Sequence, residues 1–172
     1  MLFVLGVCVS ICPFITWGFD YRTQKEIAMY EKNPLKSEMI GYISIHKINL
    51  ELPIYHGTDE NVLRKGVGHI ATSPLPIGTE NTHSLLAGHR GLPGAQLFSR
   101  LHEMEIGDLF EINILGEKVQ YKVCDVKIIK PEEVEKLWMD SKGTYVSLIT
   151  CTPYGINSHR LVVTGERMEE EK

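Results

Sequence analysis

The chain has 172 residues, of which 43% are hydrophobic and 23% are charged, and its 18 basic and 22 acidic side chains give a net charge of −4. This length and composition fit one globular domain and exclude a collagen-like, low-complexity or disordered chain. Nucleic acid is disfavoured as a partner, because no stretch concentrates the Lys and Arg needed to neutralise phosphates.

Residues 1–19 carry no charged side chain and predict an N-terminal membrane helix. At about 1.5 Å per residue, such a helix reaches roughly 28 Å, close to the ~30 Å thickness of the hydrocarbon layer. Trp17 and Tyr21 lie at its far end, where amphipathic aromatic side chains favour the membrane interface. A cleaved signal peptide is less well supported, because no basic residue precedes the run and no A-x-A site follows it. A buried core helix is the other alternative.

Residues 20–40 read as a polar connector in which Pro34 ends any helix. From residue 41 the hydrophobic period changes to two, as Ile43 and Ile45 alternate with polar side chains. After a slip of one residue at Lys47, the alternation resumes and continues to Ile54. This pattern predicts two strands joined by a bulge or a turn.

Further strands are predicted over residues 82–87, 109–115, 119–129, 144–150 and 161–165, and short helices over residues 59–65, 95–104 and 131–138. Seven or eight short strands with few helices fit a closed or nearly closed β-barrel, which removes exposed sheet edges. The fold class predicted is therefore mostly β. A glycine-rich loop over residues 88–94 follows one strand, and this loop and the end of another strand carry the candidate chemistry.

One predicted strand ends near Cys151, and turn-forming residues lead from it to a strand that begins near Arg160. A hairpin-like connection of this kind brings Arg160 within reach of Cys151. A nearby cation stabilises the thiolate, which is the attacking form of cysteine. The alternative for Cys151 is a packed, unreactive thiol, which is the common state of free cysteines.

A nucleophilic cysteine also needs a partner for proton transfer. Of the seven histidines, His89 is the best placed, because it lies just past a strand end between Gly88 and Gly91. Its alternative is an ordinary histidine of a surface loop. His83 and His159 are interpreted as structural side chains.

No metal or cofactor is predicted, because close ligand pairs such as C-x-x-C or H-E-x-x-H and the glycine-rich phosphate loops do not occur. Cys8 and Cys12 share one helix face inside the apolar segment, where helix packing is favoured over redox chemistry. Cys124 falls in a predicted strand in phase with Val126 and Ile128, which predicts that it is buried.

Three stretches, residues 41–68, 81–94 and 147–165, together resemble class C sortases, the pilin-polymerising cysteine transpeptidases of Gram-positive bacteria. The resemblance is carried by the segment T-C-T-P-Y-G, an Arg nine residues after the Cys, and the upstream G-H-R. It spans most of residues 41–167.

The resemblance implies an eight-stranded sortase β-barrel that cleaves an LPXTG-like sorting signal between Thr and Gly through a thioester. Cys151 matches the nucleophile, His89 the acid/base and Arg160 the cation beside the scissile carbonyl. Thr150, the residue before the nucleophile, is predicted to bind substrate. The implied partners are pilin or surface-protein substrates with an LPXTG-like motif, a lysine-bearing pilin acceptor and the membrane.

The organisation that follows is a transmembrane anchor over residues 1–19, a connector in place of a lid over residues 20–40, a sortase catalytic domain over residues 41–167 and a polar tail over residues 168–172. The protein is expected at the cell membrane with its catalytic domain outside the cell.

The chain departs from the family pattern at three places. Ser147 stands where the T-L-x-T-C motif has its first Thr, which keeps a hydroxyl. Asn33-Pro34-Leu35 stands where a lid would carry an Asp-Pro-aromatic tripeptide, and this predicts a lidless or open active site. The polar sequence GERMEEEK at the end predicts that a second, C-terminal membrane segment is absent or was removed.

Three other functions compete with pilin polymerisation. The first is a sortase that anchors single surface proteins to the cell wall. A papain-like hydrolase is less well supported, because there the Cys precedes the His in the sequence. The third is an inactive, membrane-anchored β-domain that only binds a partner, although Cys151, His89 and Arg160 are all present.

Overall fold

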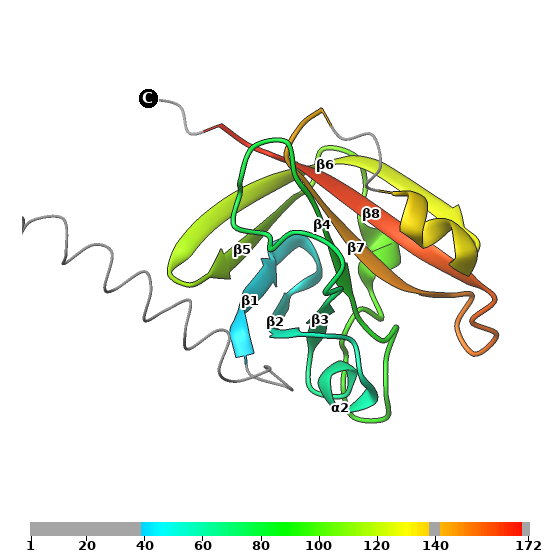
Figure 1. Ribbon diagram of the computed structural model, residues 1–172. Helices are drawn as coiled ribbons and strands as arrows, with labels where there is room; N and C mark the ends of the chain where they lie inside the picture. Colours follow the sequence, from blue (N-terminus) through cyan, green and yellow to red (C-terminus); the bar gives the residue numbers. More distant parts are fainter. Residues whose placement is uncertain (1–38, 138–141, 170–172) are drawn as a thin grey trace, which may run out of the picture. The chain divides into compact units, whose positions relative to one another are not determined.

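Eight strands form a closed barrel in the computed structural model, which describes residues 39–137 and 142–169 (Figure 1). Around the barrel the strands follow the order β1-β2-β3-β4-β7-β8-β6-β5. The mostly β fold predicted from the hydrophobic alternation is confirmed. The strands are β1 (Met39–Ile45), β2 (Leu50–His56), β3 (Val67–His69), β4 (His83–Ala87), β5 (Leu109–Ile114), β6 (Glu117–Ile129), β7 (Tyr145–Thr152) and β8 (His159–Arg167).

The described helices are all short: the α-helix α2 (Glu60–Leu63) and the 3₁₀-helices η1 (His46–Ile48), η2 (Leu101–Glu103) and η3 (Pro131–Lys136). The slip of the hydrophobic pattern at Lys47 is the helical turn η1, which joins the antiparallel strands β1 and β2. Asn49 ends that turn with a φ of 50°, in the left-handed region that asparagine tolerates. Ile43 and Ile45 on β1 are fully buried, as the alternation predicted.

A stacked pair of aromatic rings from two adjacent strands lies in the barrel core. Phe110 on β5 and Tyr121 on β6 stack with ring centroids 5.3 Å apart and an angle of 13° between their planes. Gly165 on β8 makes room for this pair, because a Cβ atom there would lie 2.4 Å from Cε1 of Phe110. A larger residue at position 165 would therefore push β8 away from the core.

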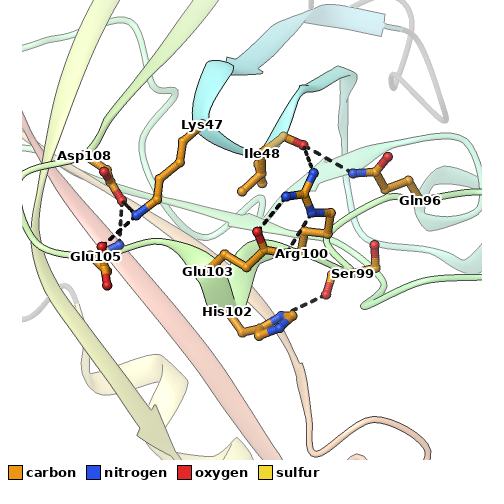
Figure 2. A network of polar contacts seen from close by, with 9 residues as sticks. All are labelled: Lys47, Ile48, Gln96, Ser99, Arg100, His102, Glu103, Glu105 and Asp108. Carbon is orange, nitrogen blue, oxygen red and sulfur yellow. Dashed lines mark hydrogen bonds and ion pairs between the residues drawn. The ribbon is translucent and has the colours of Figure 1, made fainter.

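A network of polar side chains fastens the β1–β2 turn to the segment that precedes β5 (Figure 2). Lys47 Nζ lies 2.8 Å from both Glu105 Oε2 and Asp108 Oδ2. Arg100 donates to the backbone oxygen of Ile48 at 3.1 Å and pairs with Glu103 at 2.6 Å. These contacts are partly exposed, so they fix the geometry of the turn more than they add stability.

Three details differ from the sequence-based expectations. The three-residue strand β3 was not predicted, because Gly66 and Gly68 read as the end of a helix. The helix expected over residues 95–104 is limited to η2, and turns fill the rest. Cys124 is exposed, not buried, because the register of β6 against β8 shifts between Val123 and Asp125 and reverses the alternation of faces.

Within the part of the chain that the structure describes, no helix is long and apolar enough to cross a membrane. The predicted anchor with Cys8 and Cys12, the connector as far as residue 38, and residues 170–172 of the polar tail lie outside that part.

Candidate active site

The parallel pairing of β4 with β7 brings the glycine-rich loop to the end of β7. The last residue pair of this ladder joins Ala87 to Ile149. One residue further on, the backbone N–H of Gly88 donates to the oxygen of Ile149 at 3.0 Å. Extending the register by two residues places His89 level with Cys151. The structure therefore brings the predicted acid/base and the predicted nucleophile to neighbouring chain segments.

Cys151 and Arg160 are direct partners in the antiparallel pair of β7 and β8. Such partners have Cβ atoms about 4.5–5.5 Å apart on the same face of a sheet. The Cys151 thiol is free and partly exposed. Arg160 Nη1 donates to the backbone oxygens of Asn157 at 3.1 Å and His159 at 3.0 Å, which hold its guanidinium at the β7–β8 loop. The hairpin predicted to return Arg160 to Cys151 is confirmed.

The ring of His89 faces a carboxylate from α2. His89 Nε2 lies 3.4 Å from Glu60 Oε2, an ion-pair distance, but the two atoms are not aligned as a hydrogen bond. This buried nitrogen has no hydrogen-bond partner among the residues that the structure describes. Arg64 binds the other carboxylate oxygen of Glu60 at 2.9 Å, and Asp59 caps the helix through two backbone N–H groups. Sequence analysis missed Glu60, because 29 positions separate it from His89 and no spacing motif links them.

Comparison with known proteins identifies the family of this chain. A model described as the sortase domain matches residues 43–168. Sortase D from Bacillus subtilis is 32% identical to the chain over 138 residues, which are 78% of this chain and 67% of that protein. The chain belongs to the sortase family of cysteine transpeptidases.

Among solved structures, this sortase is similar to class C members. Sortase C1 from Streptococcus agalactiae shares 46% identity with a TM-score of 0.75, over 81% of this chain and 72% of that one. Sortase C from Streptococcus pneumoniae shares 44% identity with a TM-score of 0.74, over 77% and 70% of the two chains. Both likenesses support the class C assignment and the eight-stranded sortase barrel.

Thr150, the predicted substrate-binding residue of the sortase, directs its side chain inward. The residue is 2% exposed, and its hydroxyl donates to the backbone oxygen of Gly88 at 2.8 Å. It alternates along β7 with Cys151 and so shares its face with Val146 and Leu148 of the main core. The structure thus gives the Thr150 hydroxyl a partner within the protein, next to the loop that carries His89.

A buried chain of polar side chains crosses the same strands below the site. His83 Nε2 lies 2.8 Å from Ser147 Oγ, and Ser147 Oγ lies 2.7 Å from Thr164 Oγ1. Burial lowers the pKa of His83, so its neutral form is favoured. His83 is therefore a structural side chain, as predicted.

The remaining candidates lie away from the site. Cys124 is exposed on β6, and its thiol has a raised pKa because of partial burial and the nearby carboxylates of Glu166 and Asp125. Over residues 39–137 and 142–169, no group of three or more His, Cys, Asp or Glu side chains is arranged to hold a metal ion.

Proposed function

We propose that this sortase is a pilin-polymerising transpeptidase that cleaves an LPXTG-like signal between Thr and Gly and joins it to a lysine amine of a pilin. The observation that supports the proposal most directly is the pairing of Cys151 with Arg160, next to the loop that carries His89. Two similar proteins add support: one is named as a sortase C2 of a Group B Streptococcus pilus island, and the pneumococcal sortase C is described in terms of pilin substrate specificity.

In the first half of the proposed reaction, the Cys151 thiolate attacks the threonine carbonyl carbon. A carbon–sulfur bond forms and the carbonyl electrons move onto oxygen. The Arg160 cation on the adjacent strand stabilises that oxyanion, and the loss of a comparable donor costs about 3–4 kcal/mol of barrier. When the intermediate collapses, the carbon–nitrogen bond breaks, and protonated His89 gives its proton to the leaving glycine amine. The product is a thioester on Cys151.

In the second half, a lysine amine of the acceptor attacks the thioester. Neutral His89 takes a proton from this amine, the carbon–sulfur bond breaks, and the Cys151 thiolate is restored. The new bond is an isopeptide bond between the two proteins. Attack by water in place of the amine gives hydrolysis.

The test is to incubate the full chain with an LPXTG-type peptide and a lysine-bearing pilin acceptor and to analyse the products by mass spectrometry. We expect an acyl adduct on Cys151 and an isopeptide-linked product. Both disappear in Cys151→Ala and persist in Cys124→Ser, the matched control for a second free thiol. No adduct with any of several sorting motifs, or an adduct on Cys124, would overturn the proposal. A preference for a cell-wall cross-bridge amine over the pilin lysine would instead favour the anchoring function.

We further propose that residues 1–19 anchor the protein in the cell membrane, with the catalytic domain outside the cell and no lid over Cys151. The charge-free run of residues 1–19 and the missing tripeptide support this arrangement. Cell fractionation of the full chain and of a form that lacks residues 1–19 tests the anchor.

The open active site has a separate test, in which a thiol reagent labels Cys151. Deletion of residues 20–38 should leave the labelling rate of Cys151 unchanged, and a large acceleration would contradict the open site.

A further inference from the structure

The residues that flank Cys151 bind the residues that flank His89. On one side, Thr150 donates its hydroxyl to the backbone oxygen of Gly88 at 2.8 Å. On the other side, Arg90 Nη1 donates to the hydroxyl of Thr152, and the same nitrogen lies 3.5 Å from the backbone oxygen of Cys151. We call this pair of contacts the clamp. It is formed by Thr150 with Gly88 and by Thr152 with Arg90.

The clamp holds the two chain segments without occupying the site. Side chains alternate between the two faces of a strand, so Thr150 and Thr152 share one face of β7 while Cys151 points to the other. The two threonines are 2% and 8% exposed, whereas Cys151 is partly exposed. One buried and one partly buried polar contact thus fix the backbone on either side of Cys151 and leave the face of its thiol open to a substrate.

Two further contacts hold the backbone of the loop that carries His89, and they do not involve the imidazole ring. The backbone oxygen of His89 accepts a hydrogen bond from the N–H of Phe98 at 3.0 Å. The fully buried ring of Phe98 lies against Gly88, where an added Cβ atom would be 2.7 Å from Cδ2 of the ring. The loop backbone is thus held at Gly88 and at His89. The clamp adds the side-chain hydrogen bonds that connect this loop to β7.

We propose that Thr150 and Arg90 are positioning residues that fix the distance between the His89 imidazole and the Cys151 thiol. This inference rests on the proposed roles of Cys151 and His89. It reassigns Thr150 from substrate binding to positioning, and it gives Arg90 a role that the G-H-R motif alone did not suggest. Proton transfer requires hydrogen-bond reach, and a misplacement of about 1 Å can cost roughly 10²-fold in rate.

The test compares matched variants of the full chain in peptide transpeptidation. Thr150→Val keeps the shape of the side chain but removes its donor, and Thr150→Ser keeps the hydroxyl. We expect Thr150→Val to lower kcat by about 10- to 100-fold with KM changed less than about threefold, and Thr150→Ser to stay within about threefold of the wild type. A substrate-binding role would raise KM instead.

Arg90 provides an independent test, because it is only partly buried and its replacement is expected to leave the fold intact. Arg90→Ala should lower kcat with little change in KM, and Arg90→Lys should keep part of the rate. Adding Thr152→Val to Arg90→Ala should cause no further loss, because the two side chains act through one contact.

The control is Thr144→Val, which removes a similar threonine-to-backbone hydrogen bond just before the opposite end of β7, from Thr144 to Thr79 at 3.1 Å. It should leave kcat unchanged. The folded fraction of each variant is measured by thermal unfolding. If Cys151→Ala is inactive while Thr150→Val and Arg90→Ala are as active as the wild type, the clamp is wrong and the proposed function stands. If Cys151→Ala or His89→Ala remains fully active, the proposed site itself is wrong.

Discussion

The His89 imidazole is paired with a carboxylate that only the fold brings to it. Glu60 Oε2 lies 3.4 Å from Nε2 of the ring, and Arg64 holds the other oxygen of the same carboxylate. The negative charge of this carboxylate acts electrostatically on the imidazole that gives and takes protons in the proposed reaction. More than half of the Glu60 side chain is exposed, so solvent screens much of this effect.

We therefore predict that Glu60→Gln lowers kcat/KM by no more than about fivefold. The loss should shrink at high ionic strength, because salt screens an exposed charge pair. The measurement is peptide transpeptidation by the wild type and Glu60→Gln in low and in 1 M salt. Glu132→Gln, at an exposed position in η3, is the control and should have no effect. A loss that persists at high salt would show that Glu60 acts through packing and not through its charge.

Among single residues, the contacts that depend on local spacing in the sequence could be predicted. Cys151 and Arg160 could be predicted as neighbours, because a short connection rich in turn-forming residues returns the chain beside its start. Cys124 was placed on the wrong face, because it was interpreted in phase with Val126, whereas the preceding alternation ends at Val123 and the bulge in β6 shifts it by one residue. Glu60 was missed because its contact with His89 depends on the pairing of β3 with β4, which follow α2 and precede the His89 loop, respectively.

At the scale of the strands, the chain His83–Ser147–Thr164 connects the three strands on which the candidate site is built. His83 belongs to β4, Ser147 to β7 and Thr164 to β8, and all three side chains are buried. The shared partner is Ser147, which is fully buried and contacts both of the others.

Ser147→Ala is predicted to lower the free energy of unfolding by about 1–3 kcal/mol, because it leaves His83 and Thr164 without this buried partner. Ser147→Thr keeps the hydroxyl and restores the residue of the family motif, so it should lose less. Urea unfolding of the three proteins measures the difference. Equal stability of Ser147→Ala and the wild type would mean that another group satisfies His83 in the folded protein.

Most strands could be predicted from the sequence in one of two ways. In β5, alternation marks a strand that is buried on one face, and in β7 a mostly apolar run lies next to turn-forming residues. The exception is β3, which has only three residues, one of them Gly68, and is too short to show either pattern. The helix expected over residues 95–104 is reduced to η2, since the turns of this segment pack Leu97 and Phe98 into the core instead. Short apolar runs do not distinguish a helix from a packed loop.

At the scale of the whole molecule, two buried histidines couple stability to pH. Burial lowers the pKa of His69 and of His83 below the ordinary value of 6.5. The unfolded chain therefore binds protons at a pH where the folded chain still excludes them, and the free energy of unfolding increases with pH in that range.

The stability that comes from keeping both rings neutral is complete above about pH 6.5 and is lost as the pH falls below that value. We predict that the free energy of unfolding decreases between pH 7 and pH 5, by at most about 1.4 kcal/mol per pH unit for each histidine. His83→Gln should reduce this slope, whereas His102→Gln, at an exposed position, should not. Urea unfolding at a series of pH values gives the slopes, and a flat profile for the wild type would contradict the prediction.

Closure of the barrel depends on β1, which pairs with β2 on one edge and with β5 on the other. Gly41 is the partner of Ile114 across the β1–β5 edge. A Cβ atom at position 41 would lie 2.0 Å from the backbone oxygen of Asn113 and 2.6 Å from Cγ1 of Ile114. The obstacle includes backbone of the neighbouring strand, which a change of side-chain conformation cannot relieve.

We predict that Gly41→Ala separates β1 from β5 and lowers the free energy of unfolding by about 1–3 kcal/mol or more, as overpacking does in a tight core. Ser44→Ala, on the same strand pair and opposite Glu111, is the control and should cost less than about 1 kcal/mol. Urea unfolding measures the free energies, and hydrogen exchange locates the change. Protection should be lost first in the amides that join β1 to β5, while β7 and β8 keep theirs, because the pairing of Cys151 with Arg160 does not involve β1. Uniform loss of protection over the whole barrel would show instead that closure and the β7–β8 hairpin form a single cooperative unit.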